Sequence, residues 1–233
     1  MELICKFFLY FIIYSFLGWL MEVICKYFEF KRFINRGFLI GPICPIYGYG
    51  VLAIILLIGK DINDPLAVFL KAILICSLLE YATSYFMEKI FKARWWDYSQ
   101  RKFNINGRIC LETMIPFGLL GCTVIYLIHP NIVKIIDLLP STIIFILSII
   151  LFIIYLIDNI VSFNVMNKIK EEIKKQAKDN TEVIHKKINE WLDNHSFLYR
   201  HIKLAYPKFR ISNILLEKIK SNKSLKRSKK NEK

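Results

Sequence analysis

The chain has 233 residues, of which 55% are hydrophobic, 15% are aromatic and 22% are charged. A soluble domain of this length is seldom so apolar, so the composition indicates an integral membrane protein. The formal net charge is +14, and from Asp158 onward nineteen Lys and Arg stand against nine Asp and Glu. Such a segment could bind anionic lipid, nucleic acid or an acidic partner. A cytoplasmic location under the positive-inside rule explains it most simply, so membrane lipid is an expected partner and nucleic acid is not.

Five apolar runs follow one another along the first two thirds of the chain. They cover residues 7–23, 43–58, 66–87, 109–128 and 138–157, and the second is the shortest. A transmembrane helix needs ~20 mostly apolar residues, so each run is a candidate span. The first run contains Glu22 and does not end in a small-residue cleavage site, so we expect a retained helix and no cleaved signal peptide.

The C-terminal segment shows a different pattern. Apolar residues recur at helical spacing from Val165 to Trp191, which predicts an amphipathic helix, interrupted near residues 179–180. Its apolar stripe could pack on this protein, on a partner, on itself as a coiled coil, or on the membrane surface. Residues 201–219 are broken at Pro207, and the residues after 221 are expected to be disordered.

These patterns predict an all-α integral membrane protein with about five transmembrane helices and a cytoplasmic amphipathic helical tail. The expected division is a transmembrane part over residues 1–160, a helical tail over 161–220 and a disordered basic C-terminus over 221–233. Loops rich in Lys and Arg follow the first and third runs, whereas the second and fourth loops are nearly neutral. The positive-inside rule then places the N-terminus outside and the C-terminus in the cytoplasm, and the bacterial plasma membrane is the expected location.

The sequence lacks the motifs that are typical of several kinds of site and enzyme. None of the six cysteines forms a C-x-x-C pair and the four histidines are distant from them, so neither a metal site nor a cofactor is expected. The sequence has no G-x-x-x-x-G-K-[ST], H-E-x-x-H or G-x-S-x-G. These absences argue against an intrinsic ATPase, a zinc metalloprotease and a serine hydrolase, and no catalytic residue is assigned.

Charged residues near the membrane interior form the main candidate site. A charge at the centre of a membrane helix costs ~2.5–3.5 kcal/mol on insertion scales, so such residues are candidates for function. Glu80, Ser84 and Glu88 recur at four-residue spacing and share one helix face. The cluster is either a cytoplasm-facing polar cavity that binds a solute, binds a headgroup or relays protons, or a set of ion pairs that fixes helix packing. Because isolated charge near the membrane interior is costly, we expect Arg108 to lie within ion-pair distance of at least one of Glu22, Glu80, Glu88 or Glu112. The candidate substrate-binding residues are Glu22, Glu80, Ser84, Glu88, Arg108, Glu112, Arg36 and Arg94.

Two further groups of residues are candidates for a helix break and for an aromatic belt. The first could break a helix at membrane depth, although a Pro could equally begin the second helix; it comprises Gly41, Pro42, Pro45, Gly48 and Gly50. The second is expected to form an interfacial aromatic belt rather than a ligand-stacking site; it comprises Trp19, Trp95, Trp96 and Tyr98. Gly18 shares a helix face with Ser15 and Glu22, and we expect another helix to approach closely there.

Four blocks in this order carry a resemblance to a known family. They read YSFLGWLMEV (14–23), NRGFLIGPICPIYGYG (35–50), LEYATSYFMEKIFKARWWDYS (79–99) and FNINGRICLE (103–112). Over residues 7–127 the chain resembles the putative ABC-transporter type IV family of bacterial membrane proteins. The resemblance implies a permease-like role beside a separate ATPase, and a chain of five spans would need an oligomer or a partner to form a full translocation path.

Three function classes therefore remain open. The first is a permease-like subunit of a transport system with a polar site that faces the cytoplasm. The second is a non-transporting membrane scaffold or regulator whose basic tail recruits a partner. The third is a membrane enzyme that acts on a lipid or wall precursor. Transport predicts an ATPase partner, a scaffold predicts an ion-paired core, and an enzyme predicts a carboxylate whose loss abolishes activity without affecting folding.

Overall fold

The computed structural model describes residues 1–58, 63–91, 93–176, 190–191, 197–206 and 210–211. Helices dominate these residues: α1 (Glu2–Phe30), α2 (Pro45–Ile58), α3 (Pro65–Phe91), α4 (Leu111–Thr123), α5 (His129–Asp137), α6 (Ser141–Gln176) and α8 (Phe197–Ala205). A π-helical turn, η1 (Val124–Ile128), joins α4 to α5. Two antiparallel pairs of two-residue strands complete the fold, β1 (Ala93–Arg94) with β4 (Arg210–Ile211) and β2 (Asn104–Ile105) with β3 (Ile109–Cys110).

The lengths of the helices confirm the predicted class, an all-α membrane protein. Within the described residues, four helical stretches are long and apolar enough to cross a membrane: Glu2–Phe30, Pro65–Phe91, Leu111–Asp137 and Ser141–Glu172. The remaining predicted span is also an apolar helix, α2, but it has only 14 residues. At 1.5 Å per residue α2 is about 21 Å long, shorter than the ~30 Å hydrocarbon core of a bilayer.

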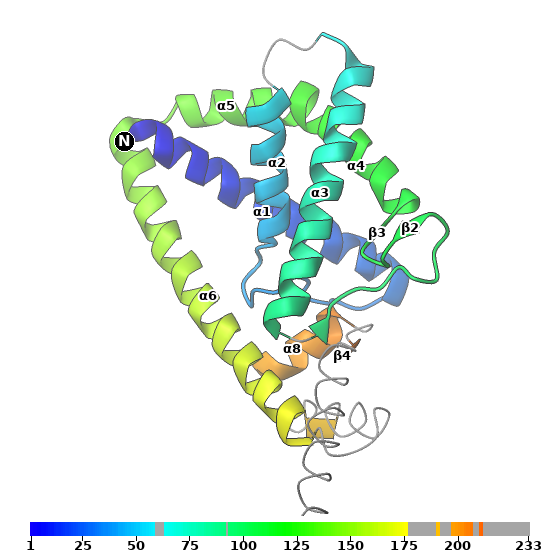
Figure 1. The fold of residues 1–233 in the computed structure, drawn as a ribbon. Coiled ribbons are helices and arrows are strands. Elements are labelled where there is room, and N and C mark those ends of the chain that lie inside the picture. The colour runs from blue at the N-terminus through cyan, green and yellow to red at the C-terminus, as the bar shows by residue number, and fades with distance from the viewer. Residues whose placement is uncertain (59–62, 92, 177–189, 192–196, 207–209, 212–233) are drawn as a thin grey trace, which may run out of the picture.

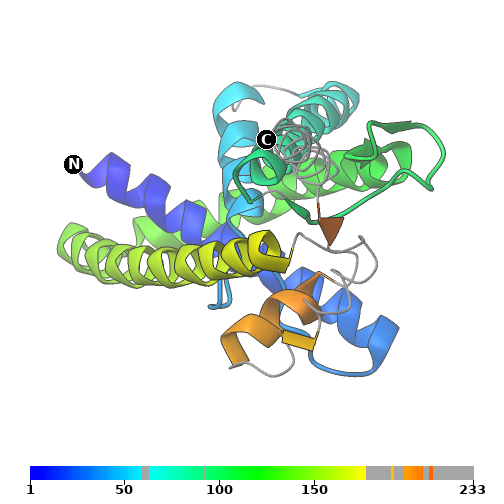
Figure 2. The same cartoon turned by 60° about the horizontal axis from the view of Figure 1, so that its bottom comes forward.

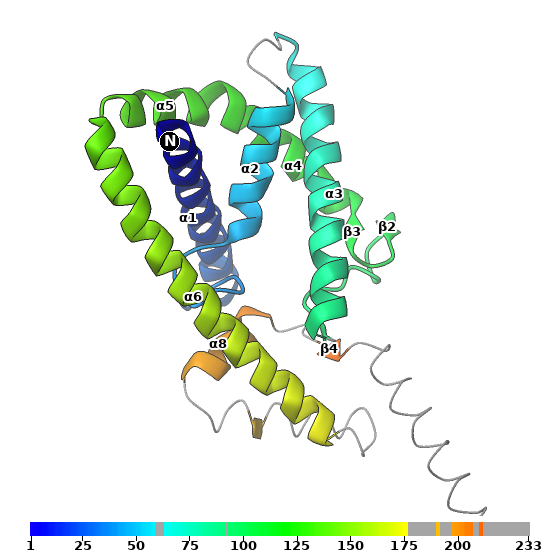
Figure 3. The ribbon, with the colours of Figure 1, turned by 60° about the vertical axis from the view of Figure 1, so that its left-hand side comes forward.

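The helices α1, α2, α3, α4 and α6 run in alternate directions (Figures 1 and 3). In both views α2 and α3 stand side by side, α1 crosses next to α2, and α6 descends along the other side of the bundle. The loops after α1 and α3 therefore lie toward one end of the molecule, together with α8. The N-terminus and α5 lie at the other end. This arrangement matches the alternation that the charges of the loops predicted.

The fourth predicted span bends at its end. Residues up to 128 belong to α4 and η1, and the chain then turns into α5, which lies across the end of the bundle (Figures 1 and 3). A π-helical turn and a proline are both common causes of a sharp helix bend, and here η1 is followed by Pro130 in the first turn of α5. The bend turns α5 across the end of the bundle, although α4, η1 and α5 together form the helical stretch Leu111–Asp137.

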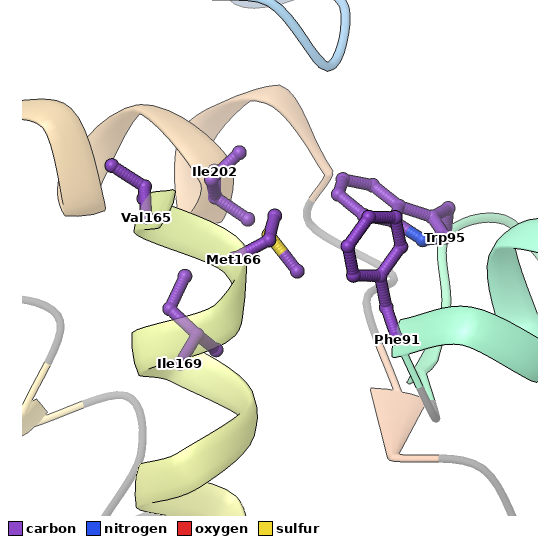
Figure 4. Packing of buried hydrophobic residues seen from close by; sticks show 6 residues of the cluster. All are labelled: Phe91, Trp95, Val165, Met166, Ile169 and Ile202. Carbon is purple, nitrogen blue, oxygen red and sulfur yellow. The ribbon is translucent and has the colours of Figure 1, made fainter. Parts of the chain in front are cut away.

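The tail helix α8 packs against the bundle. Figure 4 shows Phe91 and Trp95, from the end of α3 and the loop after it, facing Met166 of α6 and Ile202 of α8. All four side chains are at most 3% exposed. Figure 2 shows the same end of the molecule, where α8 lies beside the C-terminal half of α6. Burial of apolar area at this junction holds the tail helix on its own protein.

The amphipathic helix predicted from Val165 is described only in part. Val165 and Ile169 are buried in the cluster with α8, so packing on this protein accounts for the start of the stripe. The predicted interruption near residues 179–180 and the break at Pro207 lie outside the described residues. Helix α6 runs without interruption through residues 160 and 161, where the transmembrane part was expected to end.

Candidate functional site

Four polar side chains form a buried row along one face of α3. Ser77, Glu80, Ser84 and Glu88 are separated by three or four residues, so they lie on one face of the helix. Their exposures are only 5%, 8%, 4% and 5%, although α3 is otherwise rich in apolar residues. A buried polar group costs free energy unless it is hydrogen-bonded, so the partners of this row decide what it can do.

Glu88, at the end of the row, is neutralised by two arginines. Its Oε2 lies 2.6 Å from Nη2 of Arg108 and 3.4 Å from Nε of Arg94. The side chains of Glu88 and Arg108 are 7% and 9% exposed, so this is a buried ion pair. The expectation that Arg108 pairs with a nearby carboxylate is confirmed. Breaking such a pair would leave an uncompensated charge, which typically costs about 3–5 kcal/mol.

Arg108 is fixed on every side. Its Nη1 donates to Ser84 Oγ at 3.1 Å, and its guanidinium lies 5.7 Å and 5.5 Å from the ring centroids of Tyr81 and Tyr85. Its backbone carbonyl accepts from Trp96 Nε1 at 2.9 Å. Hydrogen bonds and cation–π contacts both favour a charged guanidinium in a desolvated place. These contacts of Arg108 therefore hold α3 against the loop that follows it.

Glu80 lies two turns along the same face and has different surroundings. Its Oε1 accepts a hydrogen bond of 3.3 Å from the hydroxyl of Tyr98, whereas no described group hydrogen-bonds its Oε2. No Lys, Arg or His nitrogen of the described residues lies within 4.0 Å of this carboxylate. Burial and the adjacent Glu80 raise the pKa of the Tyr98 phenol, so Tyr98 remains a donor at neutral pH.

Glu22 of α1 forms a second charged contact with the loop before α2. Its Oε2 lies 3.1 Å from Nε of Arg36, and its Oε1 accepts a 2.7 Å hydrogen bond from the hydroxyl of Tyr47. The guanidinium of Arg36 also lies 5.4 Å from the ring centroid of Tyr206, just after α8. Glu22 remains 28% exposed at its side chain, so its pairing is less buried than that of Glu88.

Glu112 does not join this group. It pairs with Arg101 at 2.8 Å, but the two side chains are 56% and 57% exposed. The sequence placed Glu112 with the other acids because it lies four residues after Arg108 at the start of a helix. The prediction was wrong because α4 begins at Leu111 with Glu112 on its exposed side. An exposed pair of this kind contributes about 0–1 kcal/mol.

The residues expected to break a helix behave in two ways. Gly41 and Pro42 lie in the loop before α2, and Pro45 is the first residue of α2, where a missing N–H is harmless. Gly48 and Gly50 lie inside α2, which is continuous, so neither breaks the helix, and the alternative that a proline begins it applies. Gly48 instead allows close contact with α1, since a Cβ there would lie 2.2 Å from Ser15 Oγ.

The close approach predicted at Gly18 is confirmed. A Cβ on Gly18 would lie 2.2 Å from Cγ of Tyr47, so the ring of Tyr47 occupies the space that a side chain would need. This contact places the Tyr47 hydroxyl beside Glu22. A small residue on α1 thus positions a hydrogen-bond donor that comes from α2.

The four aromatics assigned to an interfacial belt have individual partners. Trp95 is 2% exposed and packs between Phe91 and Tyr206, so an interfacial position was wrong for this residue. Trp96 donates to the Arg108 carbonyl, and Tyr98 donates to Glu80. Trp19 Nε1 donates to Asn35 Oδ1 at 2.6 Å. Polar contacts within the protein thus orient three of the four rings.

Asp158 is a site residue that the sequence analysis did not identify. Its Oδ1 and Oδ2 each accept a 2.9 Å hydrogen bond, from the backbone N–H of Ile40 and of Gly41 respectively. Ser162 Oγ also donates to Oδ1 at 3.2 Å. This carboxylate ties α6 to the loop that carries Arg36. Asp158 directly follows the fifth apolar run, so the same test for acids near membrane spans could have identified it.

One pocket lies away from these charges. It has a volume of about 200 Å³ and is lined mainly by apolar atoms at the N-terminal ends of α1 and α6, by Met1, Glu2, Cys5, Ser141, Ile144 and Phe145. None of the candidate site residues contributes to it. The polar row of α3 instead contacts the segment 93–110, which supplies Arg94, Tyr98 and Arg108.

Comparisons with known proteins give one match. A sequence model of the family described as putative ABC-transporter type IV matches residues 9–163, which include most of α1, all of α2 to α5 and most of α6. The matched residues contain every candidate polar residue of the site. Comparisons with curated proteins and with solved structures found no match.

Proposed function

Because the chain belongs to the putative ABC-transporter type IV family, we propose that it is a permease-like membrane subunit that works with a separate ATPase. The sequence supports a separate energy source, since it has no phosphate-binding loop of the type G-x-x-x-x-G-K-[ST]. The apolar helices support a multi-pass membrane protein. The proposed location is the bacterial plasma membrane with the N-terminus outside and the C-terminus in the cytoplasm.

The observation that carries this proposal is the state of Glu80. An ionisable residue buried within a membrane helix is costly, and such residues mark solute, ion or proton pathways in many membrane proteins. Glu80 is 8% exposed and has no described cationic partner, whereas Glu88 on the same face has two. A purely structural carboxylate would be expected to have a counter-charge, as Glu88 does. Glu80 is therefore the candidate contact for a transported or coupling species.

The loop end of the bundle is the proposed place of contact with the ATPase. It carries the basic loops after α1 and α3 and the docked helix α8. Contacts of Asp158 with the loop before α2, and of Arg36 with Tyr206, connect this end to both α6 and the residue that follows α8. A partner bound here would act on the same loops that hold Glu22 and Glu88. Assembly with a second copy or another membrane subunit would complete a translocation path.

Co-purification tests the proposed function. The full-length protein, carrying an affinity tag, would be purified from its native membrane in a mild detergent, and the associated proteins identified by mass spectrometry. We expect an ATPase with a phosphate-binding loop in roughly fixed proportion to the tagged chain, and absent when an unrelated multi-pass protein is purified in the same way. Repeated purification of the intact protein without any ATPase would contradict the proposal.

A scaffold or regulator is the second candidate, and the pairing of Glu22 and Glu88 favours it. Both carboxylates are ion-paired to arginines of the loops, which is the arrangement expected of a core built to fix helix packing. A scaffold would co-purify with a partner that lacks ATPase motifs. The same purification therefore separates the two candidates.

A further inference from the structure

The buried acids of the bundle differ in how their charge is compensated. Glu22 lies 3.1 Å from Arg36, and Glu88 lies 2.6 Å from Arg108 and 3.4 Å from Arg94. Within the described residues, no cationic nitrogen lies within 4.0 Å of Glu80. The three arginines thus pair with Glu22 and Glu88, and none of them neutralises Glu80.

Two oxygen atoms in the buried row also lack hydrogen-bond partners among the described residues. They are Oε2 of Glu80 and Oγ of Ser77, and both residues are more than nine-tenths buried. The two side chains lie three residues apart and so occupy adjacent turns of the same face of α3. A buried polar atom without a partner costs ~1–3 kcal/mol, so two on one face of one helix indicate a common ligand.

The groups around Glu80 are oxygen atoms and no cation. Tyr98 from the loop donates its hydroxyl proton to Oε1, and the hydroxyl of Thr113 from α4 also lies near the carboxylate. Thr113 also donates to the Cys110 carbonyl at 2.9 Å and accepts from the Cys110 N–H at 3.4 Å, which fixes its hydroxyl at the start of α4. Glu22 of α1 contributes a further negative charge, and Cys76 on α3 is the nearby thiol. These oxygen atoms and the nearby negative charge of Glu22 disfavour binding of an anion beside Glu80 and favour binding of one positive charge.

We propose that Glu80, with Ser77 and the hydroxyls of Tyr98 and Thr113, forms a binding site for a single positive charge, either a proton or a hard monovalent cation such as Na⁺. Hard cations prefer oxygen ligands, and a proton on Oε2 would neutralise the same carboxylate without any ligand shell. The site deepens the proposed function, on which it rests, by naming the species that Glu80 holds. A positive charge bound here would neutralise Glu80, as the arginines neutralise Glu22 and Glu88.

Infrared difference spectroscopy on the full-length protein in lipid nanodiscs tests this site. Spectra would be recorded across a pH series in NaCl and in choline chloride, and binding of radioactive Na⁺ would be measured on the same samples. Glu80→Gln removes the charge while keeping the size of the side chain. Glu80→Asp retains the charge and shows whether a change at this position alone prevents folding. Glu112→Gln is the matched control, because Glu112 is exposed and paired at the surface.

The expected result is a protonated-carboxyl band in choline that is lost in Glu80→Gln and unchanged in Glu112→Gln. If the site takes Na⁺, NaCl diminishes the band and Na⁺ binding is lost in Glu80→Gln. If it takes only a proton, the band is the same in both salts. A band that persists in a folded Glu80→Gln protein, or neither a band nor bound Na⁺ in the wild type, would overturn the proposal. Failure to co-purify an ATPase would contradict only the proposed transport role, because neither the infrared band nor Na⁺ binding depends on a partner.

Discussion

Glu88 and Glu80 lie on the same face of α3, two turns apart, and are buried to nearly the same extent, at 5% and 8% exposure. Glu88 contacts two arginines, whereas Glu80 contacts a tyrosine hydroxyl. The segment 93–110 causes this difference, since Arg94 and Arg108 from it pair with Glu88 and Tyr98 from it donates to Glu80. Burial alone therefore does not distinguish the two carboxylates, whereas the partners supplied by the neighbouring loop do.

Arg108→Met should give the largest effect, because it removes the main partner of Glu88. Leaving a buried carboxylate unpaired costs about 3–5 kcal/mol, and the remaining contact with Arg94 places the expected loss near the lower limit. Thermal unfolding in detergent, followed by size-exclusion chromatography, would measure it. Arg101→Met is the control and should change stability by at most about 1 kcal/mol, because its pair with Glu112 is exposed. Equal losses in both variants would contradict the buried-pair interpretation.

Gly48→Ala should come next and should affect the Glu22 side of the bundle. The new Cβ would lie 2.2 Å from Ser15 Oγ and 2.6 Å from the Phe11 carbonyl oxygen, so α2 must shift away from α1. Overpacking of this kind costs about 1–3 kcal/mol. Gly50→Ala is the matched control in the same helix, since its Cβ would meet Leu79 at an ordinary 3.5 Å. Equal stability of the two variants in the same unfolding assay would exclude the tight contact.

Tyr98→Phe should have a smaller effect on stability, because it removes one neutral hydrogen-bond donor from Glu80. A net hydrogen bond contributes about 0.5–1.5 kcal/mol, and the 3.3 Å distance places this one near the lower value. Its effect on the Glu80 carboxyl band should be larger, since the ionised form loses its donor and protonation becomes easier. A pH titration of that band should therefore shift to higher pH. A shift in the opposite direction would contradict the contact.

The smallest effect should be a pH dependence of the docking of α8 through His201. Burial lowers the pKa of His201, which is 2% exposed and faces the carbonyls of Gly37 and Leu39. Because the folded state takes up this proton less readily than the unfolded state, the contribution of His201 is complete above about pH 6.5 and decreases as the pH falls below it. Limited proteolysis of the tail at pH 7.5 and 5.5, compared with His201→Gln, would measure this change. Identical pH dependence in the two proteins would rule out His201 as its source.

Much of the fold could be predicted from the sequence, because apolar runs near the length of a span and alternating loop charges both report directly on membrane crossing. The five runs correspond to α1, α2, α3, α4 with η1, and α6. The bend into α5 and the packing of α8 could not be predicted, since they depend on tertiary contacts. Trp95 illustrates this limit of sequence-based prediction. It was expected in an interfacial aromatic belt, but residues of α6 and α8 bury it.

The site was predicted less completely. Four-residue spacing correctly placed Glu80, Ser84 and Glu88 on one buried face, and the cost of isolated charge correctly predicted a partner for Arg108. Which arginine reaches which carboxylate depends on the path of the segment 93–110, which could not be predicted from sequence spacing. The position of Asp158 directly after the fifth apolar run could have identified it as a candidate, but its backbone N–H partners at Ile40 and Gly41 could not be predicted from side-chain patterns.

The comparison between the two carboxylates is tested most directly by measuring Glu88→Gln and Glu80→Gln side by side for folded yield and thermal stability in the same detergent. Glu88→Gln leaves Arg108 buried without its anion, so we expect a loss of about 3 kcal/mol and reduced abundance in the membrane. Glu80→Gln strands no described cation, so we expect stability near that of the wild type. A destabilised Glu80→Gln protein beside a stable Glu88→Gln protein would contradict the assignment of the two roles.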